Sequence, residues 1–231
     1  MKKALVFLVL ITVFSSFTPT TAQTYSIKAG LNMARISGLL EGYIYYSDPQ
    51  KVKFGPLLGA TVEWPINKVF SFETGLLIST KGFKFTEQFS SEDGLERVDF
   101  KKTMSLYYLN VPITAKASFK LGGIKAYGFF GPYIGLGMYG IEKKETTING
   151  ETETQKYQSF WHGYNFPYKQ FDVGLTSGIG AGIGVFKIEL SYDFSLRDMD
   201  LNSNENTISR YHVAGVSISY IIRNNKTKQN K

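Results

Sequence analysis

The chain has 231 residues, with 26 lysines and arginines against 19 aspartates and glutamates, and it contains no cysteine. The absence of cysteine excludes disulfide bonds and a lipid-modified N-terminal cysteine. Two of the cations lie at the N-terminus and four in the last nine residues, which leaves 20 cations against 19 acids between them. This nearly neutral main part gives no support for a nucleic-acid-binding role.

The N-terminus predicts export. Lys2 and Lys3 precede an apolar run over residues 4–14, and the small residues of Thr21-Ala22 follow a polar stretch. This order is typical of a signal peptide, here residues 1–22 with cleavage after Ala22. The apolar run is about half the roughly 20 residues that a transmembrane helix needs. Later segments are not continuously apolar enough for a membrane helix, so strands would have to cross any membrane.

Seven segments with apolar residues at every second position follow along the chain, and an eighth segment, residues 127–139, is apolar on both faces. The clearest begins at Phe171, where Val173, Leu175 and Ile179 share one face and Asp172 lies on the other. Side chains of a strand alternate between two faces, and a tilted strand needs about 9–11 residues to cross a bilayer. We therefore predict transmembrane strands over residues 25–33, 55–64, 70–79, 107–117, 127–139, 171–185, 188–196 and 211–222.

The connections between these segments alternate in length. We expect short turns at 65–69, 120–124 and 185–187, and long loops at 37–52, 84–104, 140–168 and 197–210. Membrane barrels have short periplasmic turns and long external loops. The sequence therefore predicts an all-β fold, an eight-stranded antiparallel up-and-down transmembrane β-barrel over residues 23–223. A hydrophilic periplasmic tail, residues 224–231, would follow it.

Five short segments resemble a known family. They are Ile27–Asn32, Thr74–Gly82, Tyr108–Ile113, Gly131–Tyr133 and Phe171–Gly174, and they are spread over almost the whole mature chain. The sequence resembles the small outer-membrane β-barrels of Bacteroidota grouped as PorT-like or outer-membrane-protein β-barrel domains. The resemblance implies an eight-stranded barrel in the outer membrane. It does not imply one activity, and the secretion role of the namesake is not transferred to this chain.

Charged residues fall on the face of the strands that would line the lumen. Because unpaired charges are costly to bury, they should pair or stay hydrated. One interpretation is a salt-bridged plug that fills the narrow lumen. The other is a gated ion path or a carboxylate pair for acid–base chemistry. The predicted interior network comprises Lys28, Glu63, Glu73, Lys116, Asp172, Glu189 and Asp193, with Lys81 and Arg197 as further candidates.

Evidence for catalysis in the sequence is weak. Of the two histidines, His162 falls in the third long loop, and His212 begins the last strand near Asp198 and Ser209. A histidine with serine and acidic partners could serve nucleophilic catalysis, but chance proximity explains this arrangement equally well. The sequence lacks a Cys/His cluster, a phosphate loop and a calcium loop. We therefore predict no catalytic, cofactor-binding or metal-binding residues, and a protein that is not an enzyme.

Aromatic residues cluster in the predicted external loops. Two interpretations remain open, because exposed aromatics often anchor binding surfaces and barrels also carry aromatic girdles at the membrane interfaces. The expected partners are outer-membrane lipid and, through the long loops, other envelope proteins, with the barrel itself a monomer. The candidates for external binding are Tyr43, Tyr45, Tyr46, Phe160, Trp161 and Tyr164.

These features together predict a protein of the cell outer membrane with a structural, adhesive or accessory role in the envelope. Two alternatives remain at this point. One is a soluble exported barrel whose apolar face surrounds a small apolar ligand. The other is a narrow pore, which would require a continuous lumen.

Overall fold

The computed structural model describes residues 23–37, 51–90, 97–161, 168–199 and 208–224. The predicted signal peptide and most of the predicted tail lie outside these residues. None of the described residues forms a helix long and apolar enough to cross a membrane. The strands are β1 Thr24–Ser37, β2 Lys53–Pro65, β3 Phe70–Ser90, β4 Arg97–Leu121, β5 Ile124–Ile148, β6 Glu151–Phe160, β7 Phe171–Ile183, β8 Phe186–Ser195 and β9 Arg210–Asn224.

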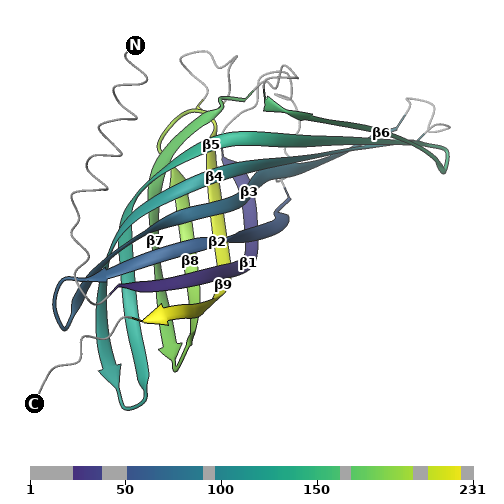
Figure 1. Ribbon diagram of the computed structural model, residues 1–231. Coiled ribbons are helices and arrows are strands. Elements are labelled where there is room, and N and C mark those ends of the chain that lie inside the picture. Colours follow the sequence, from purple (N-terminus) through teal and green to yellow (C-terminus); the bar gives the residue numbers. More distant parts are fainter. Residues whose placement is uncertain (1–22, 38–50, 91–96, 162–167, 200–207, 225–231) are drawn as a thin grey trace, which may run out of the picture.

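Eight of these strands close into a ring, as Figure 1 shows. Each pairs with its neighbour in antiparallel fashion, in the order β1-β2-β3-β4-β5-β7-β8-β9, and β9 pairs back to β1 from Arg210 to Asn224. A closed ring leaves no free sheet edge, so every strand finds its backbone partners inside the barrel. The predicted eight-stranded barrel is confirmed, with β6 as a ninth strand outside the ring.

The apolar face of the strands points away from the ring. Along β7, Phe171, Val173 and Ile179 are exposed, whereas Asp172 and Thr176 are buried. The same alternation holds around the barrel and confirms the predicted faces. An exposed apolar surface of this extent is the surface that lipid covers. Its members on other strands include Leu31, Leu58, Leu76, Ile134, Leu190 and Ile218.

Three inward glycines of β7, Gly174, Gly178 and Gly180, each lie beneath an aromatic ring of β5. Gly174 is paired with Tyr133, and Gly180 is paired with Tyr127. A Cβ atom on Gly180 would come within 2.5 Å of Cζ of Tyr127. Only glycine allows the ring to lie flat over the neighbouring backbone at such a site. The repeated glycines, which the sequence predicts only as small inward-facing residues, therefore make room for aromatic side chains in the lumen.

Short turns join the strands at one end of the barrel, as predicted. We call it the inner end, because these turns are predicted to face the periplasm. Gly122 and Gly184 adopt positive φ angles of 60° and 59°, a conformation that favours glycine. In the turn before β3, the Asn67 side chain accepts hydrogen bonds from the backbone of Val69 and Phe70, both at 2.8 Å. The prediction that the strand starting at Phe171 runs to Val185 is wrong, because the turn at Gly184 ends β7 at Ile183.

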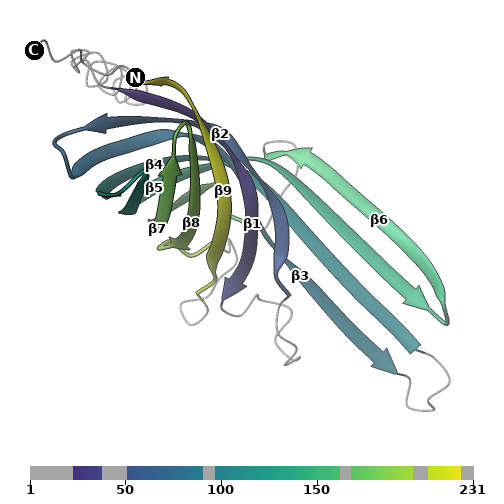
Figure 2. The same ribbon diagram turned by 90° about the horizontal axis from the view of Figure 1, so that it is seen from below.

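Two of the predicted long loops are mostly strand. The outer parts of β3, β4 and β5 (residues 84–90, 97–105 and 139–148) and all of β6 form a sheet that projects beyond the ring, which we call the extension (Figure 2). The prediction of loops at 84–104 and 140–168 is wrong there, because cross-strand pairing stabilises these polar residues as strand. Asn149 and Gly150 form the connecting turn, with φ angles of 50° and 92°. An Asn-Gly dipeptide between alternating segments is a strong hairpin signal and would have revealed β6.

Candidate functional site in the barrel lumen

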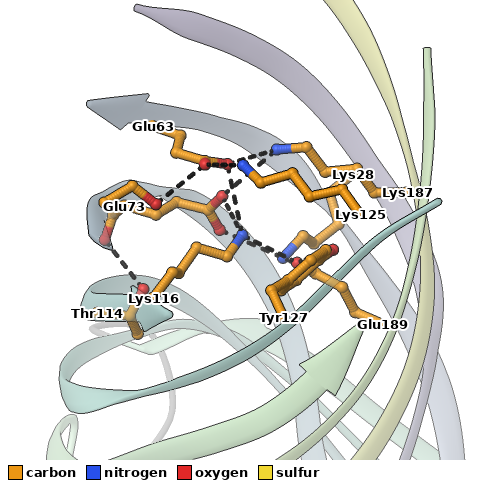
Figure 3. Close-up of polar contacts among 10 residues, drawn as sticks. Lys28, Glu63, Glu73, Thr114, Lys116, Lys125, Tyr127, Lys187 and Glu189 are labelled. Carbon is orange, nitrogen blue, oxygen red and sulfur yellow. Dashed lines mark hydrogen bonds and ion pairs between the residues drawn. The ribbon is translucent and has the colours of Figure 1, made fainter. Parts of the chain in front are cut away.

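A network of ion pairs crosses the inner half of the lumen, and Lys116 of β4 lies at its centre (Figure 3). Its Nζ atom lies 2.7 Å from Oε2 of Glu73, 3.3 Å from Oε1 of Glu189 and 3.7 Å from Oε2 of Glu63. These carboxylates come from β3, β8 and β2, so one lysine ties together strands from opposite sides of the ring. We call the whole set the inner network: Lys28, Glu63, Glu73, Lys116, Lys125, Lys187 and Glu189.

Each carboxylate of the inner network contacts at least two lysines. Glu63 lies 2.8 Å from Nζ of Lys187 and 3.1 Å from Nζ of Lys125, in addition to Lys116. Glu189 is paired with Lys28 and accepts a hydrogen bond of 2.9 Å from the Tyr127 hydroxyl. Buried charges are tolerated when they are paired and hydrogen-bonded in this way. The inner network therefore joins the walls of the barrel across its width.

A second ion pair lies further toward the outer end of the barrel. Lys81 of β3 is paired with Asp172 of β7, and both side chains are 0% exposed. Oδ2 of Asp172 also accepts hydrogen bonds from the Tyr133 hydroxyl at 2.8 Å and the Ser195 hydroxyl at 2.9 Å. The Lys81 ammonium lies over the rings of Tyr133 and Tyr108, at 4.4 Å and 4.9 Å from their centroids. The aromatic faces thus supply further favourable contacts for this buried cation.

An apolar cluster, which we call the outer plug, lies beyond this pair. Its side chains come from β1, β3, β4 and β9 and from the segments that flank β7 and β8, and Phe100 and Trp161 pack against it. Such a cluster excludes water from the outer part of the lumen. The outer plug comprises Ala34, Ile36, Phe83, Phe85, Met104, Leu106, Tyr108, Tyr168, Met199, Tyr211 and Val213.

A small cavity of about 40 Å³, lined by both apolar and polar side chains, lies along the lumen. Asp193, Asn32, Asn110 and Thr176 are among the residues that line it. This volume holds about two or three water molecules. Among the described residues, the Asp193 carboxylate has no lysine within ion-pair distance, and a hydrogen bond with the Thr176 side chain stabilises it instead.

The seven predicted interior residues all line the lumen, but they do not form one network. Five of them belong to the inner network, whereas Asp172 pairs with Lys81 and Asp193 faces the cavity. The sequence analysis missed Lys187 and Lys125, although each stands two residues before an inward side chain and shares its face. The expectation for Arg197 is wrong, because its side chain is exposed and donates to the Phe171 carbonyl at 3.3 Å.

The predicted external aromatics have different environments. Phe160 is 74% exposed and packs against Tyr139 with ring centroids 5.5 Å apart. Trp161 is instead partly buried against Tyr108 of the outer plug, at 5.5 Å between centroids, so its predicted place on an external binding surface is wrong. Adjacent residues near a strand end point to opposite sides, which explains the difference. Tyr43, Tyr45, Tyr46 and Tyr164 lie outside the described residues.

The histidine arrangement drawn from the sequence does not form. Nε2 of His212 lies 2.6 Å from the Ser37 hydroxyl, and Nδ1 lies 2.6 Å from the Tyr192 hydroxyl. Asp198 instead contacts Lys169 at 3.4 Å and accepts a hydrogen bond of 2.9 Å from the backbone of Ser209. His212 faces away from the lumen, so the barrel wall separates it from the interior carboxylates. His162 lies outside the described residues.

Comparison with known proteins assigns a family. The model of a family described as outer membrane protein beta-barrel domain matches residues 21–201. No curated protein sequence matches the chain.

Several solved barrels are similar in structure at low identity. OprG from Pseudomonas aeruginosa is 12% identical, with a TM-score of 0.43, over 88% of this chain and 97% of that one. Ail of Yersinia pestis, solved with the heparin analogue sucrose octasulfate, is 14% identical, with a TM-score of 0.38, over 88% and 100%. Neisserial surface protein A is 11% identical, with a TM-score of 0.36, over 85% and 96%.

Proposed function

Since this chain belongs to the outer membrane protein β-barrel domain family, we propose that it is a closed outer-membrane anchor that holds the extension outside the bilayer. It is a protein of the outer membrane with a structural, adhesive or accessory role in the envelope. One observation carries the proposal of a closed anchor: the lumen is filled by the inner network, the Lys81–Asp172 pair and the outer plug. Eight strands leave room only for side chains or one small ligand, and here the side chains take that room.

The distribution of polarity argues against the two alternatives. A soluble barrel around an apolar ligand would have an apolar lumen, but here the large apolar side chains cover the outside. A narrow pore would need a continuous hydrated path, whereas Met104, Leu106 and Tyr108 fill the outer end and are 0% exposed. Nonpolar side chains at that density exclude ions as well as water.

Five finer statements accompany this proposal. We infer a monomer, because the ring leaves no unpaired strand in the bilayer, and a protein that is not an enzyme. We also infer that the chain is PorT-like, on the five segments that carry the resemblance. Finally, we infer a signal peptide cleaved after Ala22 and a hydrophilic periplasmic tail from residue 224. Intact mass of the protein purified from outer membranes tests the cleavage, since a mature chain must begin at Gln23.

Heat-modifiability and conductance test the closed anchor. The full chain is expressed, extracted from outer membranes and reconstituted into planar bilayers, with a general porin as the positive control. We expect a band in unboiled gels that shifts on boiling, and no steady conductance above the lipid background. Reproducible conductance steps from the folded protein would overturn the closed lumen. Recovery from the soluble periplasmic fraction without a heat shift would overturn the membrane anchor itself.

A further inference from the structure

Four lysines lie in one cross-strand row of the extension. The pairing of neighbouring strands places Lys51 opposite Lys84, Lys84 opposite Thr103, Thr103 opposite Lys143, and Lys143 opposite Lys156. Residues paired across strands share a face, so the four ammonium groups lie on one side of the sheet. We call Lys51, Lys84, Lys143 and Lys156 the lysine row.

The lysine row is on the side of the sheet that continues the lipid-facing wall. Strand β4 runs without interruption from the inner end of the barrel into the extension. Thr103 is therefore in phase with Ile113 and Phe119, which are exposed at 39% and 61% on the outside of the barrel. The opposite face of β4 carries Met104 and Leu106 into the outer plug. The face of the sheet that carries the lysine row is therefore continuous with the surface that lipid covers.

Aromatic rings mark the membrane interface below the lysine row. Tyr107, Tyr139 and Phe160 lie side by side on the same face, with ring centroids 6.1 Å and 5.5 Å apart. Such aromatic belts lie at the headgroup level of membrane barrels. Lys143 follows Tyr139 by four residues, about 13 Å along the strand, or about 9–11 Å along the membrane normal at the usual tilt. That distance reaches the outer edge of a headgroup layer.

Among the described residues, three of the four charges in the lysine row lack a carboxylate partner. Lys143 has a carboxylate neighbour, Glu145, at 2.6 Å. Within the described part of the chain, no carboxylate lies within ion-pair distance of Lys51, Lys84 or Lys156. Like charges directly opposite each other on paired strands are destabilising, and Lys143 with Lys156 and Lys51 with Lys84 are both such pairs. An anion bound from outside would remove this repulsion.

We propose that the lysine row binds the phosphate groups of anionic lipids in the outer leaflet and so fixes the extension against the membrane surface. The proposal rests on the membrane anchor proposed above. Continuity with the lipid-facing wall and the aromatic belt below favour a membrane phosphate over a soluble polyanion. Lysine is suited to this role, because each lysine near an anionic surface strengthens the association about fivefold.

The test uses the full chain, reconstituted in nanodiscs and carrying one label. Because the chain has no cysteine, Thr154→Cys, which lies two residues from Lys156 on the same face of β6, gives a single labelling site. Energy transfer from a dye at residue 154 to acceptors on lipid headgroups is compared in pure phosphatidylcholine and with 30% phosphatidylglycerol, a composition chosen for the assay. The test variant is Lys84→Gln with Lys156→Gln. The matched control, Lys68→Gln with Lys120→Gln, removes the same charge at the inner end of the barrel.

We expect phosphatidylglycerol to raise the transfer in the parent and in the control, and high salt to abolish the rise. In the test variant the ratio of membrane-bound to unbound extension should fall about 30-fold, because two lysines are lost. Equal transfer in both lipids, or a test variant that behaves as the parent does, would overturn the proposal. Release from the nanodisc surface by soluble heparin, with no response to phosphatidylglycerol, would assign the lysine row to a soluble polyanion instead. A retained heat shift in every variant shows that the anchor is intact, so the two proposals fail separately.

Discussion

The lumen and the extension both contain lysine–glutamate pairs that join β4 to a neighbouring strand. The two groups of pairs differ in how far they are exposed to solvent. Lys116 and Glu73 join β4 to β3 inside the ring, with side chains 2% and 7% exposed. Lys101 and Glu145 join β4 to β5 in the extension, with side chains 39% and 19% exposed. The distances are the same, 2.7 Å in both cases. The contribution of an ion pair to the stability of this protein should therefore depend on how deeply the pair is buried, because the distance is the same in both places.

The reason is desolvation. A buried charge that loses its partner keeps the cost of removal from water, which makes a broken buried pair expensive. An exposed charge that loses its partner is hydrated again, so an exposed pair contributes little. Substitutions in the lumen should therefore threaten the whole barrel, whereas those in the extension should have local effects. The four predictions below test this contrast, from the largest expected effect to the smallest.

Replacing Lys81 by methionine should have the largest effect. Lys81→Met leaves Asp172 buried without its cation, and we expect a loss of about 3–5 kcal/mol in the free energy of unfolding. Unfolding in urea from lipid vesicles, followed by the gel shift, measures it. The double variant with Asp172→Leu should recover much of the loss, and Lys101→Met in the extension should cost less than about 1 kcal/mol. Equal losses for Lys81→Met and Lys101→Met would contradict the contrast.

A methyl group in the lumen should also destabilise the barrel. A Cβ on Gly178 would clash with the Leu190 carbonyl and the Phe129 ring. Gly178→Ala should therefore cost about 1–3 kcal/mol, as overpacking does. Gly182→Ala is the matched control on the same face of β7, since its nearest neighbour, the Phe186 carbonyl oxygen, lies 3.7 Å away. The same urea titration should show almost no loss for the control; a loss as large as that of Gly178→Ala would refute the steric explanation.

The hairpin turn tests whether the extension opens independently of the barrel. Gly150 has a φ angle of 92°, so Gly150→Ala should strain the turn by about 1–2 kcal/mol. The effect should stay local, because β5 is the one described strand with which β6 pairs. Hydrogen exchange should become faster in residues 139–160, while the gel shift of the barrel should not change. Loss of the shift would mean that the extension supports the ring.

The smallest effect concerns the pH dependence of the extension. Hydrogen bonds from Lys101 and Lys143 lower the pKa of Glu145 from 4.5 to about 2. The stabilisation from these contacts is therefore present above pH 4.5 and is lost as the pH falls toward 2, and it amounts to at most about 1 kcal/mol. Carboxyl NMR titration of Glu145 measures the pKa. A value near 4.5 would show that the contacts do not persist, and Lys101→Met should raise the pKa toward that value.

The sequence by itself determined the barrel, because lipid requires apolar side chains at every second position and a closed ring of antiparallel neighbours requires an even number of such strands. It also placed all seven predicted charges in the lumen, since the inward face follows from the same alternation. Which charges meet was decided only by the tertiary structure. The order and register of the strands set these contacts, which join residues that lie far apart in the chain, such as Lys116 and Glu189. The extension depended on tertiary structure only in part: the Asn149-Gly150 turn is a local signal in the sequence, but the pairing of the strands shows that the polar residues on either side form strands.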